Sequence, residues 1–585
     1  MDKNFLFAFL LSTVAIFLYY TLFPPAEKPV EQEAKKETTV VEQVADPGQS
    51  AVKTITSSTD KKPVSSTNEV VARKEISIES DFYTAKIDSK DGVLTSFYLK
   101  NYQYQSEPHF SPKDWAVSLF TGKNYKVDTF DPNRRVNMVG DLSEKNQVWR
   151  ASTGNNESPV FFQASSEKIT IGDRPEILTL KARLSSGVEV VKNITFYPKS
   201  YLIDIEVSMA NRTESAIRLS PRFNFGAGSE AIEKELFPKP KMGISLIEED
   251  FEKYDDDDFE NPMEVRQSTW TGVMDQYFIT VAKLHSPGVF NSQLSPITST
   301  LNGDEILVPK FELVEDSVLL GGNQAYQRKM RLFMGPKVKS EMETFDFYLP
   351  QAMDLGWFEF LAQPLLSILR WLQQYVINWG VAIILLTLIV RTAMFPLAFT
   401  GMRSMRKMSA LNPKIKSIRE KNKGNKERMN KEIMQFYRQH KINPMGGCLP
   451  MALQIPIFIA LYQALMPAIE LRHTPFIFWL KDLSSADFTL ILPILMGISM
   501  FVQQTLTPTP AMDPTQQKIM KWMPVMMVLF FLNMPSGLVL YWVISNLFTI
   551  GQQLIFNKVT PAPVLEIETK KSSGKKSKQG KKKKK

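Results

Sequence analysis

The feature that most constrains this chain is a set of long apolar runs that carry almost no charge. They lie near residues 5–23, 379–397, 448–469, 488–506 and 522–556. A run of about 18 or more apolar residues is long enough to cross a bilayer as a helix. Because a Pro-Ser-Gly turn divides the last run, the sequence predicts six membrane spans, five of them in the C-terminal part. A purely soluble protein is therefore excluded.

The averages over all 585 residues hide this pattern, since the mean hydropathy is only −0.16. The single cysteine, Cys448, excludes a disulfide framework and a cysteine-based zinc cluster. The four histidines lie far apart, and the chain has no H-E-x-x-H motif, dinucleotide-binding glycine loop, P-loop or nucleophile elbow. The sequence therefore predicts a protein that is not an enzyme, with no catalytic residue, no cofactor and no metal site.

The N-terminal segment joins an apolar run to a polar stretch. Lys3 precedes the run, and the chain continues with two prolines after residue 23, without the small-residue cleavage site of a signal peptide. We expect residues 1–23 to be an uncleaved membrane anchor, with a cleaved signal peptide as the alternative. Residues 24–75 are rich in Glu, Lys, Thr and Ser and poor in aromatic residues, which predicts a flexible linker.

Residues 76–345 show the alternation of apolar and polar residues that is typical of strands. Ile203, Ile205, Val207 and Met209 form one apolar face, and turn signals separate many such short segments. This pattern predicts a large antiparallel β-sandwich outside the membrane.

Residues 346–376 are predicted to connect this domain to the membrane core and to contain an amphipathic helix over 356–376. Trp357 and Tyr375 at its ends favour a position in the membrane interface. A helix packed on the sandwich is the alternative.

The distribution of charge predicts the orientation of the five-span membrane core, residues 377–556. Residues 398–443, between its first two spans, hold 13 Lys and Arg against three Glu and have the apolar spacing of a helical hairpin. The tail, residues 557–585, holds 11 Lys against two Glu. By the positive-inside rule, these segments and both termini face the cytoplasm, and residues 24–376 lie outside. The basic segments suit anionic lipid or ribosomal RNA, although a solvated topology signal explains them equally well.

Arg391 is the only charge well inside a predicted span of the core. An Arg at the centre of a membrane helix costs about 2.5–3.5 kcal/mol on insertion scales. One interpretation is a guanidinium in a hydrated groove, with Thr387 one turn earlier on the same helical face. The alternative is a side chain that snorkels to the cytoplasmic interface.

Other predicted spans carry polar side chains that we expect to face inward, because polar groups are costly against lipid tails. They are Gln454, Ser499, Gln503, Gln504, Trp542, Ser545, Asn546, Thr549 and Gln553. Together they favour a hydrated cavity, with interhelical hydrogen bonds in a dry bundle as the alternative. Seventeen of the 27 methionines lie between Met394 and Met534, which suits either a surface for varied apolar partners or gap filling in a bundle.

Several stretches of the membrane core resemble the signatures of the YidC family of membrane-protein insertases. They are 389–391 (IVR) followed by Pro396, 443–458 (NPMGGCLPMALQIPIF), 513–518 (DPTQQK) and 535–541 (PSGLVLY). The resemblance covers residues 356–556 closely, and the anchor followed by a large external domain is similar to the Gram-negative branch. Close relatives often have Tyr where this chain has Trp542, so the aromatic ring is present without a hydroxyl.

The resemblance implies a five-helix core with a hydrophilic groove that is open to the cytoplasm and to lipid. The residues that it implies for the groove are Arg391, Thr387, Gln454, Gln504, Trp542, Ser545 and Asn546. It also implies an apolar path for the substrate helix along the third and fifth spans. The residues of this path are Met451, Ile455, Phe458, Met466, Met523, Met527 and Phe530.

The function implied by the resemblance is the insertion and folding of newly made proteins of the bacterial inner membrane, alone or with the Sec translocon. The implied partners are the nascent chain, the Sec translocon, the ribosome and anionic phospholipids, and no DNA. Two alternatives stay open. A secondary transporter would show internal repeats, which we do not find, and a membrane-anchored carbohydrate-binding protein would use the sandwich.

Overall fold

The computed structural model describes thirteen stretches of the chain. They are residues 52–54, 73–104, 131, 133–140, 147–154, 159–229, 241–255, 257–285, 288–301, 304–422, 424–440, 449–507 and 514–560. The predicted anchor, most of the predicted linker and most of the Lys-rich tail lie outside these residues.

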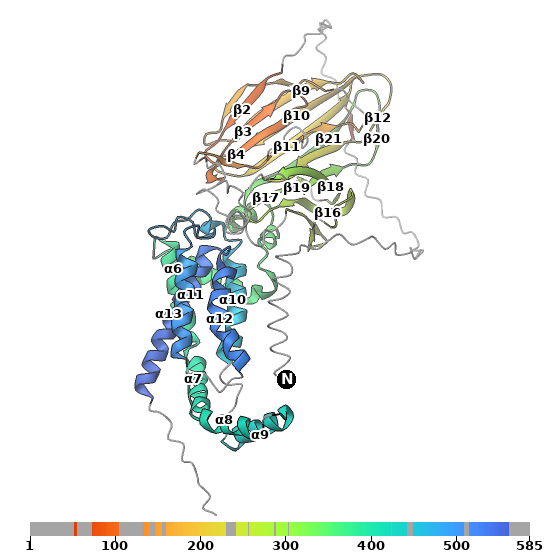
Figure 1. Cartoon of the computed structure of the whole chain (residues 1–585). Helices are drawn as coiled ribbons and strands as arrows, with labels where there is room; N and C mark the ends of the chain where they lie inside the picture. The colour runs from red at the N-terminus through yellow and green to blue at the C-terminus, as the bar shows by residue number, and fades with distance from the viewer. Residues whose placement is uncertain are drawn as a thin grey trace, which may run out of the picture. The chain divides into compact units, whose positions relative to one another are not determined.

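The N-terminal part of the described chain is built from strands (Figure 1). Their bounds are β1 Val52–Thr54, β2 Glu75–Glu79, β3 Tyr83–Asp88, β4 Val93–Gln103, β5 Arg135–Asn137, β6 Ala151–Ser152, β7 Gln163–Ala164, β8 Lys168–Thr170, β9 Glu176–Arg183, β10 Val188–Phe196, β11 Leu202–Asn211, β12 Ile217–Leu219, β13 Arg222–Gly226, β14 Met242–Ile247, β15 Asp250–Tyr254, β16 Met263–Met274, β17 Phe278–Leu284, β18 Phe290–Leu301, β19 Asp304–Val314, β20 Val318–Leu320 and β21 Gln324–Pro336. We call residues 73–353 the sheet domain.

Three sheets form the sheet domain, and their described pairings are almost all antiparallel. The largest has 14 strands, with β17, β21, β11, β10 and β9 as consecutive neighbours. A second sheet has the order β5-β4-β3-β2-β8, in which β2 and β8 are parallel, and β12 pairs with β20. Apolar side chains of the two larger sheets share one buried cluster. A strand-rich domain was predicted correctly, while the sandwich arrangement in its detail stays a prediction.

The predicted alternation is confirmed in β10 and β11. Ile203, Ile205, Val207 and Met209 are all at most 2% exposed, and β10 pairs with β11 in the register Val190↔Met209. Successive strand residues point to opposite faces, so this register brings the apolar faces of both strands into one core.

Two features of the structure lie next to the predicted domain boundaries, which themselves stay predictions. β1 lies inside the predicted flexible linker and pairs with β21, because strand pairing uses backbone groups that composition does not reveal. The core of the sheet domain also extends past residue 345. Leu349, Ala352 and Met353, in a 3₁₀ segment after the short helix α4 (Lys339–Phe345), are buried in it.

The C-terminal part is helical. The helices are α5 Glu359–Gln373, α6 Trp379–Ala393, α7 Phe395–Ala410, α8 Asn412–Lys421, α9 Lys426–Gln439, α10 Leu449–Leu465, α11 Ile491–Leu506, α12 Pro514–Phe531 and α13 Ser536–Val559. Figure 1 shows α6 and α10–α13 side by side, and their buried apolar side chains form one cluster with those of α5. We call α5, α6 and α10–α13 the helical core.

The number of spans stays a prediction. Within the described residues, α13 is the one helix that is long and apolar enough to cross a membrane alone. The pair α6 and α7 passes the same test together but is bent by 60° between Ala393 and Phe395, where the sequence analysis expected one straight span over 379–397. Pro396 at the start of α7 explains the break, because proline cannot donate the hydrogen bond that would continue α6. α12 begins at Pro514, earlier than the predicted span, since Lys518 and Lys521 interrupt the apolar run but not the helix.

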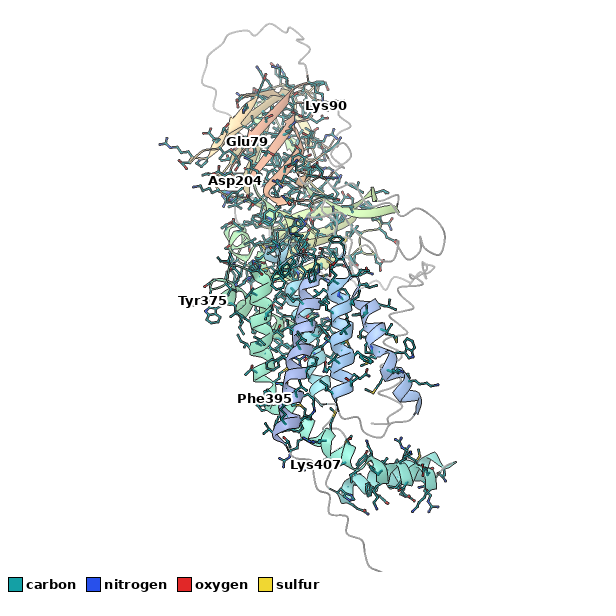
Figure 2. All side chains as sticks on the ribbon, turned by 60° about the vertical axis from the view of Figure 1, so that its left-hand side comes forward. Glu79, Lys90, Asp204, Tyr375, Phe395 and Lys407 are labelled. Atoms are coloured by element: carbon teal, nitrogen blue, oxygen red, sulfur yellow. The ribbon has the colours of Figure 1, made fainter. Side chains whose placement is uncertain are left out.

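The amphipathic helix α5 packs on the other helices of the helical core rather than on the sheet domain. Its buried residues are Ala362, Leu365, Leu366, Leu369 and Leu372, and they belong to the apolar cluster of that core. The backbone N–H of Phe358 donates to the Gln463 side chain of α10 at 3.2 Å. The aromatic residues Trp357, Phe360, Trp371 and Tyr375 stay exposed. Figure 2 places Tyr375 near one end of the helical part and Phe395 and Lys407 near the other.

The basic segment between α6 and α10 contains a small separate core. Its apolar side chains are Met408, Leu411, Ile415, Ile418, Met429, Ile433, Phe436 and Tyr437. All but Tyr437 lie at the spacing from which the hairpin was predicted, and α8 and α9 pack together through them. Most of the described basic side chains of the two helices are exposed, namely Lys414, Lys416, Lys421, Arg428, Lys431 and Arg438.

Candidate functional site

Four polar side chains from three helices lie within the helical core. They are Arg391 on α6, Gln454 on α10, and Tyr541 and Ser545 on α13. The Gln454 amide donates to the Tyr541 hydroxyl at 2.8 Å, and the Arg391 guanidinium lies within electrostatic range of the Tyr541 side chain. Ser545 lies one turn after Tyr541, hence on the same face of α13. We call these four residues the polar cluster.

The polar cluster contains buried atoms without hydrogen-bond partners. Nε of Arg391, Oε1 of Gln454 and Oγ of Ser545 have no partner within the described part of the chain. Arg391 has no ion pair there either, although carboxylates pair with arginines elsewhere in the structure. A buried polar atom left unpaired costs about 1–3 kcal/mol. The arrangement is therefore suited to receive water or polar groups of another molecule.

Thr387 and Asn546, both predicted for the groove, are hydrogen-bonded inside the helical core. Thr387 is fully buried, and its hydroxyl donates to the Ile383 carbonyl one turn earlier at 2.7 Å. Asn546 donates to the Ser499 hydroxyl of α11 at 2.9 Å. These bonds make Thr387 part of the α6 backbone network and make Asn546 a link between α13 and α11.

Gln504 lies near the end of α11. Its side-chain amide donates to the Met520 carbonyl at 2.6 Å, which ties α11 to α12. Of the seven residues predicted for the groove, Gln454 is hydrogen-bonded to Tyr541, and Ser545 follows Tyr541 by one turn of α13. Arg391 lies in the last turn of α6, on the side of Tyr541.

Trp542 stands in an aromatic group between α10, α12 and α13. Its ring centroid lies 4.9 Å from that of Phe458 and 5.1 Å from that of Phe531. The Phe530 ring continues this group at 5.2 Å from Phe531. Edge-on packing of this kind contributes about 0.5–1.5 kcal/mol per pair beyond the buried area.

The residues predicted for the apolar path fall into three groups. Ile455 is exposed, and Phe458, Met523, Met527 and Phe530 are half-buried. The Met451 side chain lies outside the described residues. Met466 differs, because it is buried at the end of α10 and its carbonyl accepts a hydrogen bond from Gln276 of the sheet domain.

A long connection, the α10–α11 loop (residues 466–487), covers one end of the helical core. Carbonyl groups of this loop accept hydrogen bonds from the starts of two helices. The side-chain amide of Asn378, before α6, donates to the Phe476 carbonyl at 2.8 Å, and the backbone N–H of Gly537 in α13 donates to the Leu483 carbonyl at 2.9 Å. Asp487 accepts from the Leu492 N–H of α11 at 2.7 Å. Helix N-termini carry N–H groups without intrahelical partners, and the contacts of Gly537 and Leu492 satisfy two of them, while Asn378 donates through its side-chain amide.

Sequence reasoning missed Tyr541 and the α10–α11 loop. Tyr541 precedes Ser545 by four residues, so the helical stripe drawn through Ser545 could have been extended to it. Asn378 and Asp487 are short polar residues placed before predicted helices, which is the signal of a cap. The partners of these caps could not be read from the sequence, because most are backbone carbonyls.

No group of three or more His, Cys, Asp and Glu that could hold a metal ion occurs within the described ranges. The polar cluster itself offers hydrogen-bonding groups and the guanidinium of Arg391.

Comparisons with known proteins define the class. Residues 371–563 match the family model "60Kd inner membrane protein", and residues 75–368 match the model "YidC periplasmic domain". A protein of Syntrophobacter fumaroxidans named "Membrane protein insertase YidC" is 35% identical over 82% of this chain and 86% of its own length. One of the same name from Syntrophus aciditrophicus is 34% identical over 95% of this chain and all of its own. Together these matches define an inner-membrane protein with a periplasmic domain.

The chain belongs to the YidC family of membrane protein insertases. The family assignment inferred from the sequence motifs is thus confirmed, and neither the transporter nor the carbohydrate-binding alternative gains support. A crystal structure titled "Active YidC insertase crystal structure with the first transmembrane domain resolved" covers 82% of this chain and 92% of its own at 18% identity, with a TM-score of 0.36.

Proposed function

We propose that this insertase receives the polar segment of a nascent membrane protein at the polar cluster, while the apolar helix of the substrate passes into lipid along α10 and α12. The observation that supports the proposal is the set of unpaired buried atoms on Arg391, Gln454 and Ser545. A dry bundle would leave those atoms unsatisfied in apolar surroundings. Water between the helices satisfies them and lowers the free energy of a polar segment part-way across the membrane.

Arg391 adds a preference for acidic segments. Two unit charges about 4 Å apart gain about 1 kcal/mol in bulk water and about 4 kcal/mol at an effective dielectric near 20. A hydrated cavity within a membrane lies between these limits. The charge of Arg391 therefore lowers the barrier for a carboxylate by an amount that insertion kinetics can resolve.

The path for the apolar helix is the surface of α10 and α12 beside the aromatic group. Ile455 is exposed there, and Phe458, Met523, Met527 and Phe530 are partly exposed. Flexible and aromatic side chains adapt to substrate helices of different shape. Met466 is left out of this path because the sheet domain covers it.

The test uses two substrates that differ only in the charge of their translocated tail. We expect Arg391→Ala to slow insertion of the acidic-tailed substrate about tenfold, which corresponds to about 1.4 kcal/mol. The neutral-tailed substrate should be affected least. Arg391→Lys should keep much of the activity, because attraction across water needs charge more than a planar fork. Rates are measured in vesicles that contain the purified variant.

Arg403→Ala is the matched control, since Arg403 is exposed on α7 and lies outside the polar cluster. Equal rates for wild type and Arg391→Ala on both substrates would eliminate the charge role. Equal losses on both substrates would assign Arg391 to structure or hydration.

The proposed topology follows the charge distribution. Both termini and the α8–α9 hairpin are cytoplasmic, residues 24–376 are periplasmic, and the core crosses the inner membrane five times after an N-terminal anchor. The exposed basic side chains of α8 and α9 support contacts with the ribosome and anionic phospholipids, and the Sec translocon is a further partner for large substrates. Binding to ribosomes that weakens steeply as salt rises supports this electrostatic contact.

A further inference from the structure

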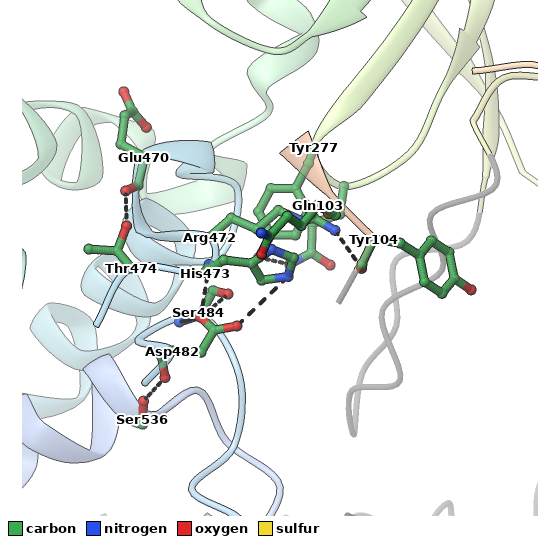
Figure 3. Close-up of polar contacts among 11 residues, drawn as sticks. Gln103, Tyr104, Tyr277, Glu470, Arg472, His473, Thr474, Asp482, Ser484 and Ser536 are labelled. Atoms are coloured by element: carbon green, nitrogen blue, oxygen red, sulfur yellow. Dashed lines mark hydrogen bonds and ion pairs between the residues drawn. The ribbon is translucent and has the colours of Figure 1, made fainter. Parts of the chain in front are cut away.

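Arg472, in the α10–α11 loop, is a buried cation whose acceptors belong to the sheet domain. Its side chain is 7% exposed. The guanidinium donates to the Gln103 carbonyl at 2.7 Å and to the Tyr104 carbonyl at 3.1 Å, at the end of β4 (Figure 3). A charged group removed from water is destabilising unless hydrogen bonds replace its hydration. The burial of Arg472 therefore depends on residues more than 360 positions earlier in the chain.

Two aromatic rings complete the surroundings of the guanidinium. Its central carbon lies 5.6 Å from the ring centroid of Tyr277 and 5.3 Å from that of Phe278, at the turn between β16 and β17. Cations above aromatic faces gain about 0.5–2 kcal/mol, most when desolvated. Arginine suits such a place because its planar group donates at its edge and stacks through its face.

Neighbouring residues extend the contact on both sides. Gln276 donates to the Met466 carbonyl at 3.0 Å. Ile469, one turn of the loop before Arg472, is 4% exposed and belongs to the apolar core of the sheet domain. The loop thus contributes a carbonyl, an apolar side chain and a cation to one continuous surface.

The sheet domain presents its half of this surface rigidly. The carboxylate of Asp275 accepts from the backbone N–H groups of Tyr277 and Phe278 at 2.8 and 2.7 Å, which fixes the β16–β17 turn. The Lys337 amine donates to the Asp275 carbonyl at 3.0 Å and secures the turn to the end of β21. A turn held in this way loses little further conformational entropy when it docks.

The other side of the α10–α11 loop forms hydrogen bonds and an ion pair with the helical core. Glu470 pairs with Arg370 of α5 at 2.8 Å. Ser536 at the start of α13 donates to the Asp482 carbonyl at 2.5 Å, and the same aspartate accepts from the His473 N–H at 3.1 Å (Figure 3). The loop is therefore held between the sheet domain and the first residues of the core helices.

We propose that residues 466–472 and the edge of the sheet domain formed by Gln103, Tyr104 and residues 276–278 are a docking surface within the chain, with Arg472 as its positioning residue. Docking couples the two parts energetically: a seated sheet domain orders the loop that joins the ends of α5, α6, α11 and α13. By linkage, an ordered loop stabilises the seated sheet domain to the same extent. This inference does not depend on how the polar cluster handles substrates.

Backbone hydrogen exchange of the full chain in lipid discs tests the proposal. Arg472→Gln removes the charge and two donors but keeps a polar side chain. We expect amide exchange to rise about tenfold on both sides of the surface, in the loop and at residues 103–104 and 275–278, corresponding to about 1.4 kcal/mol. Exchange in β9 and β10, remote from the surface, should not change. Arg266→Gln is the matched control, since Arg266 is an exposed arginine on β16.

A second variant approaches the surface from the other side. Gln276→Ala removes the bond to the Met466 carbonyl, and we expect exchange to rise about threefold in residues 466–472, which lie in the other part of the protein. If Arg472→Gln does not fold, Gln276→Ala alone tests the coupling between the loop and the sheet domain. Faster exchange confined to the loop in Arg472→Gln, or no change at 466–472 in Gln276→Ala, would overturn the coupling and leave Arg472 with a local role only.

Discussion

The cations Lys192 and Arg391 differ in how fully the chain satisfies their hydrogen-bond donors. Lys192 in β10 is fully buried, and its amine donates to the carbonyls of Gly92 at 2.8 Å and Trp149 at 2.7 Å, with the Phe162 ring 5.2 Å away. Arg391 is left with an unpaired Nε. A cation that only holds the fold together is saturated by its own chain, whereas one that receives a ligand keeps unused donors. This contrast supports the role proposed for Arg391.

The stability of the sheet domain should depend on the protonation of Lys192. Burial lowers the pKa of its amine to about 7, with Asp91 opposing the shift. The unfolded chain binds this proton up to about pH 10.5, so between pH 7 and 10 it holds more protons than the folded chain. Stability should therefore rise with pH in this window, by on the order of 3 kcal/mol. Thermal unfolding of the full chain, followed by tryptophan fluorescence from pH 7 to 9.5, measures this rise.

Lys192→Met should remove the alkaline rise and lower stability at pH 9.5, because two carbonyls lose their donor. Lys181→Met, at an exposed position of β9, is the control and should keep it. The window ends near pH 10, where buried tyrosines such as Tyr102, whose pKa burial raises to about 12, act in the opposite direction. A rise that persists unchanged in Lys192→Met would contradict the assignment.

At the scale of elements, the α10–α11 loop is ordered by short polar side chains rather than by regular structure. Asp482 accepts from the N–H and hydroxyl of Ser484 at 2.8 and 2.7 Å, and Asn378 accepts from the Gly380 N–H at 2.8 Å. These hydrogen bonds form only when the carboxylate or amide of the side chain keeps one fixed orientation. The loop is therefore sensitive to a change of charge within it.

Acidification should loosen this loop through His473. Burial lowers the pKa of His473 to about 4, the charge of Arg472 adds to the shift, and Asp482 opposes it. Between pH 6.5 and 4 the unfolded chain binds a proton that the folded chain does not, so stability falls as the pH falls. The hydrogen-exchange protection factors of residues 470–487, which are corrected for the intrinsic exchange rate at each pH, should fall across this range and level off below pH 4.

His473→Asn should flatten this acid response. The residue has a φ of +57°, a conformation that asparagine tolerates. His440→Asn on the exposed end of α9 is the control and should respond as the wild type does. An acid response of the same size in His473→Asn would place the titrating group elsewhere.

The buried face of an element could be predicted where apolar and polar residues alternate regularly. The division of an apolar surface between protein and surroundings could not. The alternation of β10 and β11 and the spacing of Ile415 and Ile433 each identify one buried face, and the structure buries those faces. The amphipathic segment 356–376, by contrast, has apolar residues of two kinds: leucines that are buried in the helical core and aromatic residues that stay exposed. All of these residues are apolar in the sequence, but the structure exposes Trp357 and Tyr375 and buries Leu365. Lipid and protein interior select the same side chains, so hydropathy alone cannot separate them.

At the scale of the whole molecule, the sheet domain and the helical core share residues. Ile469 of the loop lies in the core of the sheet domain, and that core continues through Met353. The contacts of Arg472 could not be predicted, because its acceptors are backbone carbonyls, which every residue offers. The division into a strand-rich part and a helical part could be predicted, since composition and periodicity change near residue 345.

Removing the sheet domain should leave insertion largely intact while destabilising the core. Deletion of residues 73–353 exposes Met466 and Ile469 and leaves Arg472 without its carbonyl partners. We expect a small substrate to be inserted still, and the core to unfold at a lower temperature. Adding Ile469→Ser to the deletion should recover part of the loss, because a polar side chain then replaces an apolar one that the deletion exposes to water.

Insertion assays and thermal unfolding of the two deletion variants provide the measurement. Complete loss of insertion, with the core still stably produced, would show that the sheet domain takes a direct part in the reaction. An unfolding temperature equal to that of the full chain would show that the shared residues add nothing to the core.

The position of Ile469 also sets an order of events during synthesis. The residue emerges about 130 positions after β21 ends at Pro336. At 5–20 residues per second this gap lasts about 7 to 26 seconds. During that interval the strands can already pair, but the apolar core of the sheet domain still lacks the side chain of Ile469. Ile469 follows the end of α10, so the apolar core of the sheet domain is completed only after α10 has been synthesised, and the sheet domain reaches its final packing late in translation.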